Sequence, residues 1–193
     1  PNTYFGNLAP PSTMDNMPEV MNEVKMMLGL QTSETGMQEE IARFGVKDIT
    51  DLTWKNIMDA FTCTECGRCT SVCPANMTGK KLSPRKIIMD VRDRAEIIGR
   101  TGNRDHSGSL FDHVSKEEIF ACTTCNACID ICPVSIDPVN VILGLRRYIA
   151  MEESLSPADW NMMFNNIETN FAPWKVPASD RFKWAESLMS DKK

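Results

Sequence analysis

Eight cysteines, gathered in two short runs, are the residues of this chain best suited to chemistry. The runs read CTECGRCTSVCP and CTTCNACIDICP, and the sequence holds no other cysteine. Each run has the spacing C-x2-C-x2-C-x3-C-P, which is typical of segments that bind 4Fe-4S clusters through thiolates. The spacing therefore predicts two 4Fe-4S clusters with the following ligands: Cys63, Cys66, Cys69, Cys73, Cys122, Cys125, Cys128 and Cys132.

The two runs are expected to share their clusters. In the ferredoxin pattern, three closely spaced cysteines bind three irons of one cluster, and the fourth cysteine of the run binds the other cluster. Because such crossed sites form only with iron present, we expect the iron-free protein to be largely molten over residues 60–135. The predicted sets are Cys63, Cys66, Cys69 and Cys132 for cluster one, and Cys122, Cys125, Cys128 and Cys73 for cluster two.

Two alternative roles for the cysteines fit their spacing less well. Four disulfides would agree with the even count, but disulfide scaffolds join distant segments, whereas each run places four sulfurs within a few residues. Zinc sites also use C-x2-C pairs, but tetrahedral zinc usually takes its four ligands from two separated pairs, which leaves a surplus cysteine in each run. Disulfides and zinc stay as alternatives to the clusters.

The residues around the cysteines repeat from one run to the other. Gly67 and Asn126 follow the second cysteine of each run, and Gly and Asn most readily adopt the positive φ that a tightly coiled loop requires. Such coiling is expected to direct backbone N–H groups at the sulfurs, which influences cluster potentials. At an offset of 59 residues the matches extend further, to Phe61 with Phe120, Thr64 with Thr123 and Val72 with Ile131.

The segments that flank the runs have the apolar spacing of helices and no alternation typical of strands. Ser115 and Glu118 form a capping box before the second run, and the helix between the runs is expected to end at Gly99. These patterns predict an all-α domain that binds two clusters. Helices are expected to begin at or just after the following residues: Pro18, Met37, Thr53, Ser83, Ser115 and Asp137.

Charge and hydropathy exclude some classes of function. The formal net charge is -5, and iron-bound thiolates make it more negative, so we expect no binding to nucleic acid. The chain has no run of about 18 apolar residues that would cross a bilayer, and its start, PNTYFGNLAPPST, lacks a signal pattern. We therefore expect no transmembrane segment, and a cytoplasmic protein or one peripheral to the inner face of the cytoplasmic membrane.

Basic residues gather after the first cysteine run. One interpretation is a solvated helix face, and the other is a docking face for an acidic partner or for anionic lipid head groups. The residues concerned are Lys80, Lys81, Arg85, Lys86, Arg92, Arg94, Arg100 and Arg104.

The run CTECGRCTSVCPANMTGKKLSPRKIIMDVRDR, the run CTTCNACIDICPVSIDP and their helical surroundings resemble the helical ferredoxin domain of the heterodisulfide reductase small-subunit family. Related domains occur in the iron-sulfur subunits of anaerobic glycerol-3-phosphate dehydrogenase and succinate dehydrogenase. The resemblance implies a helical ferredoxin with a pseudo-twofold repeat and with helical N- and C-terminal extensions. The expected parts are an N-terminal arm at 1–52, the dicluster domain at 53–153 and a C-terminal helical extension at 154–193.

The resemblance also implies a function. Proteins of this kind pass single electrons through two 4Fe-4S clusters within a larger oxidoreductase complex, from a flavoprotein donor to a quinone- or thiol-linked acceptor, some with a membrane subunit. This sequence departs from larger family members because it has no Cys-Cys pair and no ninth cysteine, so we expect no CCG-type reaction centre. A stand-alone disulfide oxidoreductase and a redox sensor are the alternatives, but no flavin phosphate loop, spare reactive cysteine or DNA-binding module is visible.

Overall fold

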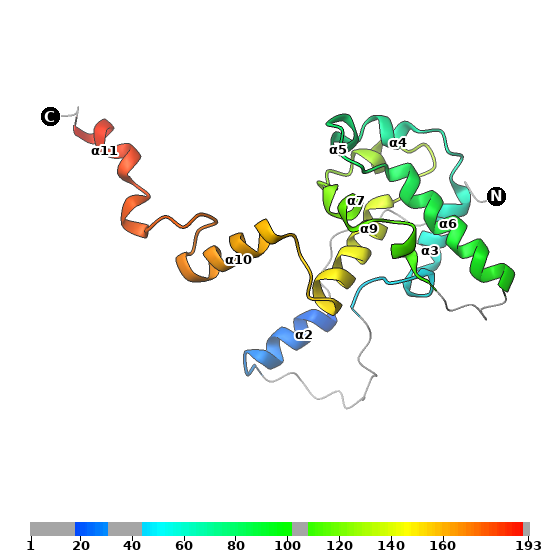
Figure 1. The fold of residues 1–193 in the computed structure, drawn as a ribbon, viewed down its shortest axis with the longest axis horizontal. Helices are drawn as coiled ribbons and strands as arrows, with labels where there is room; N and C mark the ends of the chain where they lie inside the picture. The colour runs from blue at the N-terminus through cyan, green and yellow to red at the C-terminus, as the bar shows by residue number, and fades with distance from the viewer. Residues whose placement is uncertain (1–17, 31–43, 102–107, 191–193) are drawn as a thin grey trace. The chain divides into compact units, whose positions relative to one another are not determined.

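The computed structural model describes residues 18–30, 44–101 and 108–190, and these residues form helices and loops without a β-strand (Figure 1). The predicted all-α class is therefore confirmed. The chain divides into two compact units, which meet between Glu152 and Glu153 and are described separately below.

The first unit holds the cysteine runs. The chain forms α2 (Pro18–Met27), η1 (Ile49–Asp51), α3 (Trp54–Thr62), α4 (Arg68–Ser71), α5 (Pro74–Met77), α6 (Pro84–Thr101), η2 (Leu110–Asp112), α7 (Lys116–Ala121), α8 (Ala127–Asp130), α9 (Pro138–Arg147) and the π-helix η3 (Tyr148–Glu152). The helix predicted from Met37 to Phe44 lies outside the described residues, apart from Phe44 itself.

Predicted caps begin the helices on either side of the cysteine runs. Thr53 Oγ1 accepts a hydrogen bond from the backbone N–H of Asn56 (3.3 Å), and Ser115 forms the predicted capping box with Glu118. Asp137 caps α9 by accepting a hydrogen bond from the N–H of Asn140 (2.9 Å). These bonds satisfy N–H groups that lack a partner in the first helical turn, which sets where each helix begins.

The helix between the runs begins as predicted but ends later. Ser83 Oγ accepts a hydrogen bond from the N–H of Lys86 (3.3 Å), and Pro84 is the first residue of α6. We expected Gly99 to end this helix, but it continues to Thr101, because Gly99 keeps a negative φ instead of the left-handed conformation of a terminating glycine.

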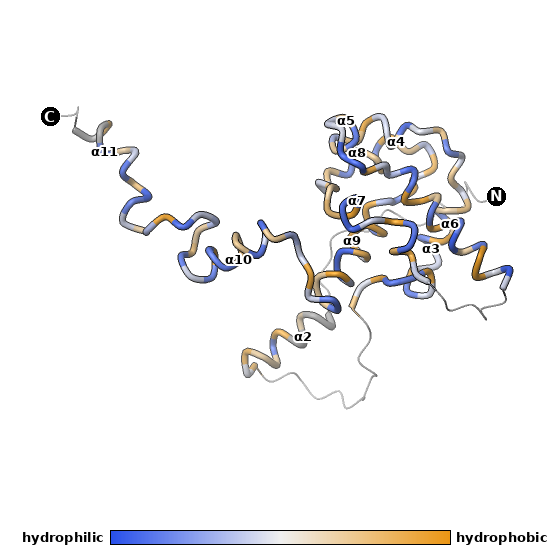
Figure 2. The backbone as a smooth tube through the Cα atoms, viewed as in Figure 1, coloured by the Kyte–Doolittle hydropathy of each residue, from blue (hydrophilic) through white to orange (hydrophobic). Residues whose placement is uncertain are grey.

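Helices α6 and α9 pack together and form the centre of the core. Figure 2 shows apolar and polar stretches alternating along α6, as expected for a helix that buries one face. Burial of each large aliphatic side chain contributes roughly 1.5–3 kcal/mol relative to exposure. The fully buried side chains include Ile87, Ile88 and Val91 of α6, Val141, Ile142 and Leu145 of α9, Leu82 just before α6, and Leu110, Val114 and Ile119 from the segments between the two helices.

Two contacts attach the segment before α3 to this core. The N–H of Val46 donates to the carbonyl oxygen of Gly144 in α9 (2.9 Å), at a point where Gly45 adopts a φ of +82°. Arg94 of α6, which is 4% exposed, forms an ion pair with Asp48 (2.6 Å) and donates to the carbonyl oxygen of Gly108 (3.0 Å). The first and last parts of the unit are thus held around α6 and α9.

The second unit consists of α10 (Ala158–Asn170), η4 (Ala178–Asp180) and α11 (Lys183–Ser190). Among its described residues, Ala185 is the buried apolar side chain, and large aromatic residues such as Trp160, Phe171 and Trp184 are exposed. None of the helices in the described parts of the chain combines the length and the hydropathy that a membrane crossing requires.

Candidate iron-sulfur site

The two cysteine runs have the same local structure. Helix α3 leads into Cys63 and α7 into Cys122, so that the first cysteine of each run directly follows a helix. Four residues later the chain turns in the left-handed conformation, at Gly67 (φ 78°) and Asn126 (φ 62°), and a one-turn helix begins there. The predicted positive φ is therefore confirmed in both runs. The repeat that the sequence shows is also present in the backbone conformation.

A second left-handed residue in each run was not predicted. Glu65 (φ 58°) and Thr124 (φ 54°) occupy equivalent places, two residues after the first cysteine. Neither Glu nor Thr favours this conformation, so the residue types do not predict a left-handed turn at these positions. The double turn brings the second and third cysteines of each run back toward the first.

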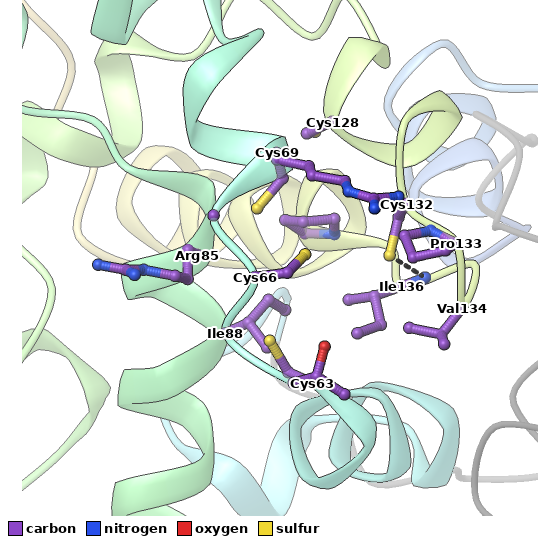
Figure 3. Close-up of a pocket in the computed structure, with 14 residues that line it drawn as sticks. Cys63, Cys66, Cys69, Arg85, Ile88, Cys128, Cys132, Pro133, Val134 and Ile136 are labelled. Carbon is purple, nitrogen blue, oxygen red and sulfur yellow. Dashed lines mark hydrogen bonds between the residues drawn. The ribbon is translucent and has the colours of Figure 1, made fainter.

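A cavity joins the first three cysteines of one run to the last cysteines of the other. Its lining includes Cys63, Cys66, Cys69, Cys128 and Cys132. Figure 3 shows the sulfur atoms of Cys63, Cys66, Cys69 and Cys132 around the same space, with Ile136 and Val134 on one side and Arg85 pointing away from it. The structure thus brings together the residues predicted to hold cluster one.

The residues predicted for cluster two also lie near one another. Charge on Cys73 of the first run and on Cys125 acts on the thiol of Cys122, and charge on Cys122 and Cys125 acts on that of Cys128. Cys73 and Cys128 are buried, and Cys125 is exposed. Contact between the runs is therefore reciprocal, as crossed ligand sets require.

The thiols are poorly placed to ionise without metal. Burial raises the pKa of the Cys63, Cys69 and Cys122 thiols, and it raises the pKa of Cys128 to about 12. Negative charge on neighbouring cysteines adds to this effect. Such thiolates need positive charge beside them, which irons supply, so the donor set fits the predicted clusters.

Backbone N–H groups point at two of the sulfurs. The N–H of Thr124 donates to Cys122 Sγ (3.4 Å), and the N–H of Ile136 donates to Cys132 Sγ (3.4 Å). Hydrogen bonds of this kind favour the thiolate and raise the reduction potential of a bound cluster. The first bond lies within the coiled loop, where N–H groups were predicted to point at a sulfur, and the second lies just after the run.

A cluster and a single metal ion need different spacings of their donors. Over the ranges that the structure describes, no three His, Cys, Asp or Glu side chains converge closely enough to hold one metal ion, and all eight cysteines are free. Zinc would draw its sulfurs to about 2.3 Å from one centre. In a 4Fe-4S cluster each thiolate binds a different iron, so its four sulfurs stand farther apart than the ligands of one zinc ion.

An arginine that the sequence pattern did not single out contacts the second run. Arg146 of α9 donates through Nε (3.0 Å) and Nη2 (2.8 Å) to the carbonyl oxygen of Ile119, and also to that of Cys122. Its guanidinium lies 5.8 Å from the ring centre of Phe120. No local sequence pattern predicts this contact, because these residues are more than 20 positions apart in sequence.

Most of the predicted basic face is neutralised within the chain. Lys80 and Arg85 have no ion pair among the residues that the structure describes, and Arg104 lies outside them. Arg68, which lines the cavity with Arg85, is likewise exposed without an ion pair in the described ranges. The paired residues are Lys81 with Glu117, Lys86 with Asp90 and Glu118, Arg92 with Glu65, Arg94 with Asp48, and Arg100 with Glu96.

Known proteins are similar to this chain in the region of the cysteine runs. Residues 62–136 match the family model of the 4Fe-4S dicluster domain. The chain is 32% identical to the EtfAB:quinone oxidoreductase of Syntrophomonas wolfei, over 77% of this chain and 24% of the relative. It is 33% identical to the probable iron-sulfur-binding oxidoreductase FadF of Bacillus subtilis, over 74% of this chain and 25% of the relative.

A shorter relative is also similar. A heterodisulfide reductase subunit-like protein of Archaeoglobus profundus is 28% identical, over 73% of this chain and 62% of the relative. The chain spans about a quarter of the length of the first two relatives. Its residues 62–136 are a 4Fe-4S dicluster domain that binds two 4Fe-4S clusters and is similar to the heterodisulfide reductase subunits.

Proposed function

We propose that this chain relays single electrons through its two clusters within a larger oxidoreductase complex. The observation that carries the proposal is which thiols are exposed and which are buried. Cys66 and Cys125, which are equivalent in the two runs, are exposed, whereas Cys73 and Cys128 are buried where the runs meet. Each cluster would then have one corner at the surface and one side toward its neighbour, which suits an electron that enters at one cluster and leaves from the other.

The ligand sets in this proposal are the crossed ones. Cys63, Cys66, Cys69 and Cys132 hold cluster one, and Cys122, Cys125, Cys128 and Cys73 hold cluster two. A cluster of this kind accepts one electron and spreads the added charge over several atoms. The role of the chain is to hold the two clusters side by side, to cover them with apolar residues such as Ile88 and Ile136, and to exclude water from the region between them.

The partners belong to the same proposal. We infer a flavoprotein donor, a quinone- or thiol-linked acceptor, and a location in the cytoplasm or at the inner face of the cytoplasmic membrane, where a membrane subunit would adjoin the complex. The names of two relatives, which mention a quinone and a heterodisulfide, support these classes of acceptor.

Two exposed arginines suggest where one partner docks. Arg68 and Arg85 line the cavity of cluster one beside the exposed thiol of Cys66. An acidic partner surface would be attracted to this place, and salt would weaken the attraction. Substituting both arginines with Ala should slow electron transfer from an acidic flavodoxin at low salt and flatten its salt dependence. Replacing Lys25 and Lys175, which are exposed elsewhere, should change neither the rate of electron transfer nor its salt dependence.

The relay itself is tested by redox titration of the anaerobic, cluster-loaded chain. We expect the protein to take up two electrons in two reversible one-electron steps and to return them to a one-electron acceptor such as ferricyanide. The expected result includes no reduction of a disulfide substrate by the chain alone. Unaided turnover of such a substrate, or clusters that do not cycle reversibly, would contradict the proposal.

A further inference from the structure

The duplicated runs differ in charge at three matched positions, which are Glu65 and Thr124, Arg68 and Ala127, and Ser71 and Asp130. Glu65 and Thr124 are equivalent, because each is the second residue after the first cysteine of its run and each has a φ between 50° and 60°. The carboxylate of the first run is therefore replaced by a neutral hydroxyl in the second.

Two arginines from the helices that follow the runs also belong to the comparison. Arg92 stands eight residues after Pro84, the first residue of α6, and Arg146 stands eight residues after Pro138, the first residue of α9. Each helix follows one cysteine run, and its arginine lies beside the start of that run. Arg92 forms an ion pair with Glu65 (2.9 Å), whereas Arg146 donates to the backbone carbonyl oxygens of Ile119 and Cys122.

At these matched positions the first run has a positive and a negative charge, and the second has a positive charge and a hydroxyl. Arg146 acts directly at the second run, because its guanidinium donates to the backbone carbonyl oxygen of Cys122. Arginine stays protonated in proteins, so this positive charge is permanent.

Other charges near the runs largely match or are screened. Asp59 and Glu118 are equivalent buried acids, 59 residues apart, and each has a lysine partner, Lys55 and Lys86 respectively. The charges without a counterpart in the other run, Arg68 and Asp130, are exposed, as is Arg85, and water and salt weaken their effect. Arg146 is half-buried against a phenyl ring, where a charge acts more strongly than at the surface.

We propose that Arg146, beside a hydroxyl at Thr124 where the first run has a carboxylate, places the reduction potential of cluster two above that of cluster one. An added electron makes a cluster more negative, so a nearby positive charge favours the reduced form. The deeper burial of Cys73 and Cys128 works in the opposite direction, but it also strengthens the effect of Arg146. This inference depends on the relay and ligand sets proposed above. One electron leaves cluster one, which is oxidised by one unit, and enters cluster two, which is reduced by one unit.

The test is a potentiometric titration of the anaerobic, cluster-loaded full chain, followed by electron paramagnetic resonance. The Cys125→Ala variant, expected to lose cluster two, assigns the remaining wave to cluster one. We expect Thr124→Glu to lower the potential of cluster two and Glu65→Thr to raise that of cluster one, so that the exchange of both residues closes or inverts the gap. Glu168→Gln, an exposed charge change in the second unit, should shift neither wave.

Two variants of Arg146 separate its charge from its hydrogen bonds. Arg146→Lys keeps the charge and should leave the potential of cluster two nearly unchanged, whereas Arg146→Gln should lower it. If the higher wave belongs to cluster one, or if Thr124→Glu leaves cluster two unshifted, the inference is overturned while the relay stands. If neither cluster cycles reversibly, the relay itself fails. Thr124→Glu remains informative if Arg146→Gln does not load its cluster.

Discussion

At the scale of single residues, two glycines with nearly the same backbone conformation have very different surroundings. Gly45 has a φ of +82° and Gly79 a φ of +80°. A Cβ on Gly45 would lie 2.3 Å from the backbone nitrogen of Tyr148 and 2.6 Å from the carbonyl oxygen of Gly144, whereas no described residue comes within 4 Å of a Cβ on Gly79. A side chain at position 45 would therefore overlap with backbone atoms and strain the positive φ, whereas a side chain at position 79 would only strain the positive φ.

The two glycines can therefore be compared by the same substitution. We expect Gly45→Ala to destabilise the cluster-loaded protein by about 3 kcal/mol or more, because overlap with backbone atoms adds to the strain of positive φ. Gly79→Ala should cost only about 1–2 kcal/mol, the strain itself. Thermal unfolding under anaerobic conditions measures both. Equal losses in the two variants would show that the close approach at Gly45 is of no importance.

At the scale of elements, the ion pair between Asp48 and Arg94 fastens the turn at η1 to α6. Arg94 is 4% exposed and donates to both carboxylate oxygens of Asp48. Arg94→Met would leave the Asp48 carboxylate without its main partner in a largely buried place, and we expect a loss of about 3 kcal/mol. Denaturant unfolding of the loaded protein measures this change.

A second arginine of the same helix is the control. Arg100 pairs with Glu96 across one turn (2.7 Å) but is 80% exposed. Since exposed pairs of this type contribute at most about 0.5 kcal/mol, Arg100→Met should leave stability nearly unchanged. If both variants lost the same amount, the buried pair would not be what fastens η1.

At the scale of the whole molecule, crossed ligation makes each cluster depend on both runs. We expect Cys132→Ala to disrupt cluster one, although Cys132 belongs to the second run. Alkylation of the native protein followed by mass spectrometry should then label the freed thiols of the first run and leave those of the second run protected. Cys73→Ala should give the reverse pattern. Labelling confined to the run that carries the substitution would refute the crossed sets.

Iron removal should act on the same region. Thiols gathered around one cavity, several of them partly buried, are stable together only with the charge and bonds of the metal, so binding free energy becomes folding free energy. We expect a chelated sample to lose amide protection across residues 60–135 in hydrogen exchange. Protection equal to that of the loaded protein would show that the apolar core around α6 and α9 folds this region without iron.

Much of the site follows from patterns confined to a few residues. The spacing of the cysteines, the caps at Thr53, Ser115 and Asp137, and the positive φ at Gly67 and Asn126 were all predictable, because each depends on groups within about one turn of chain. The helical class followed for the same reason, since apolar periodicity is a local property of a segment.

Other features arise only when distant segments meet. The left-handed turns at Glu65 and Thr124 have no local preference behind them, and the neutralised basic face depends on acids from other elements. In the sequence Arg146 looks like an ordinary surface cation. Only in the structure does α9 pack against α7, so that its guanidinium donates to the carbonyl oxygens of Ile119 and Cys122. Charge acts across space and not along the chain, so the electrical difference between two nearly identical cysteine runs became visible only with the fold.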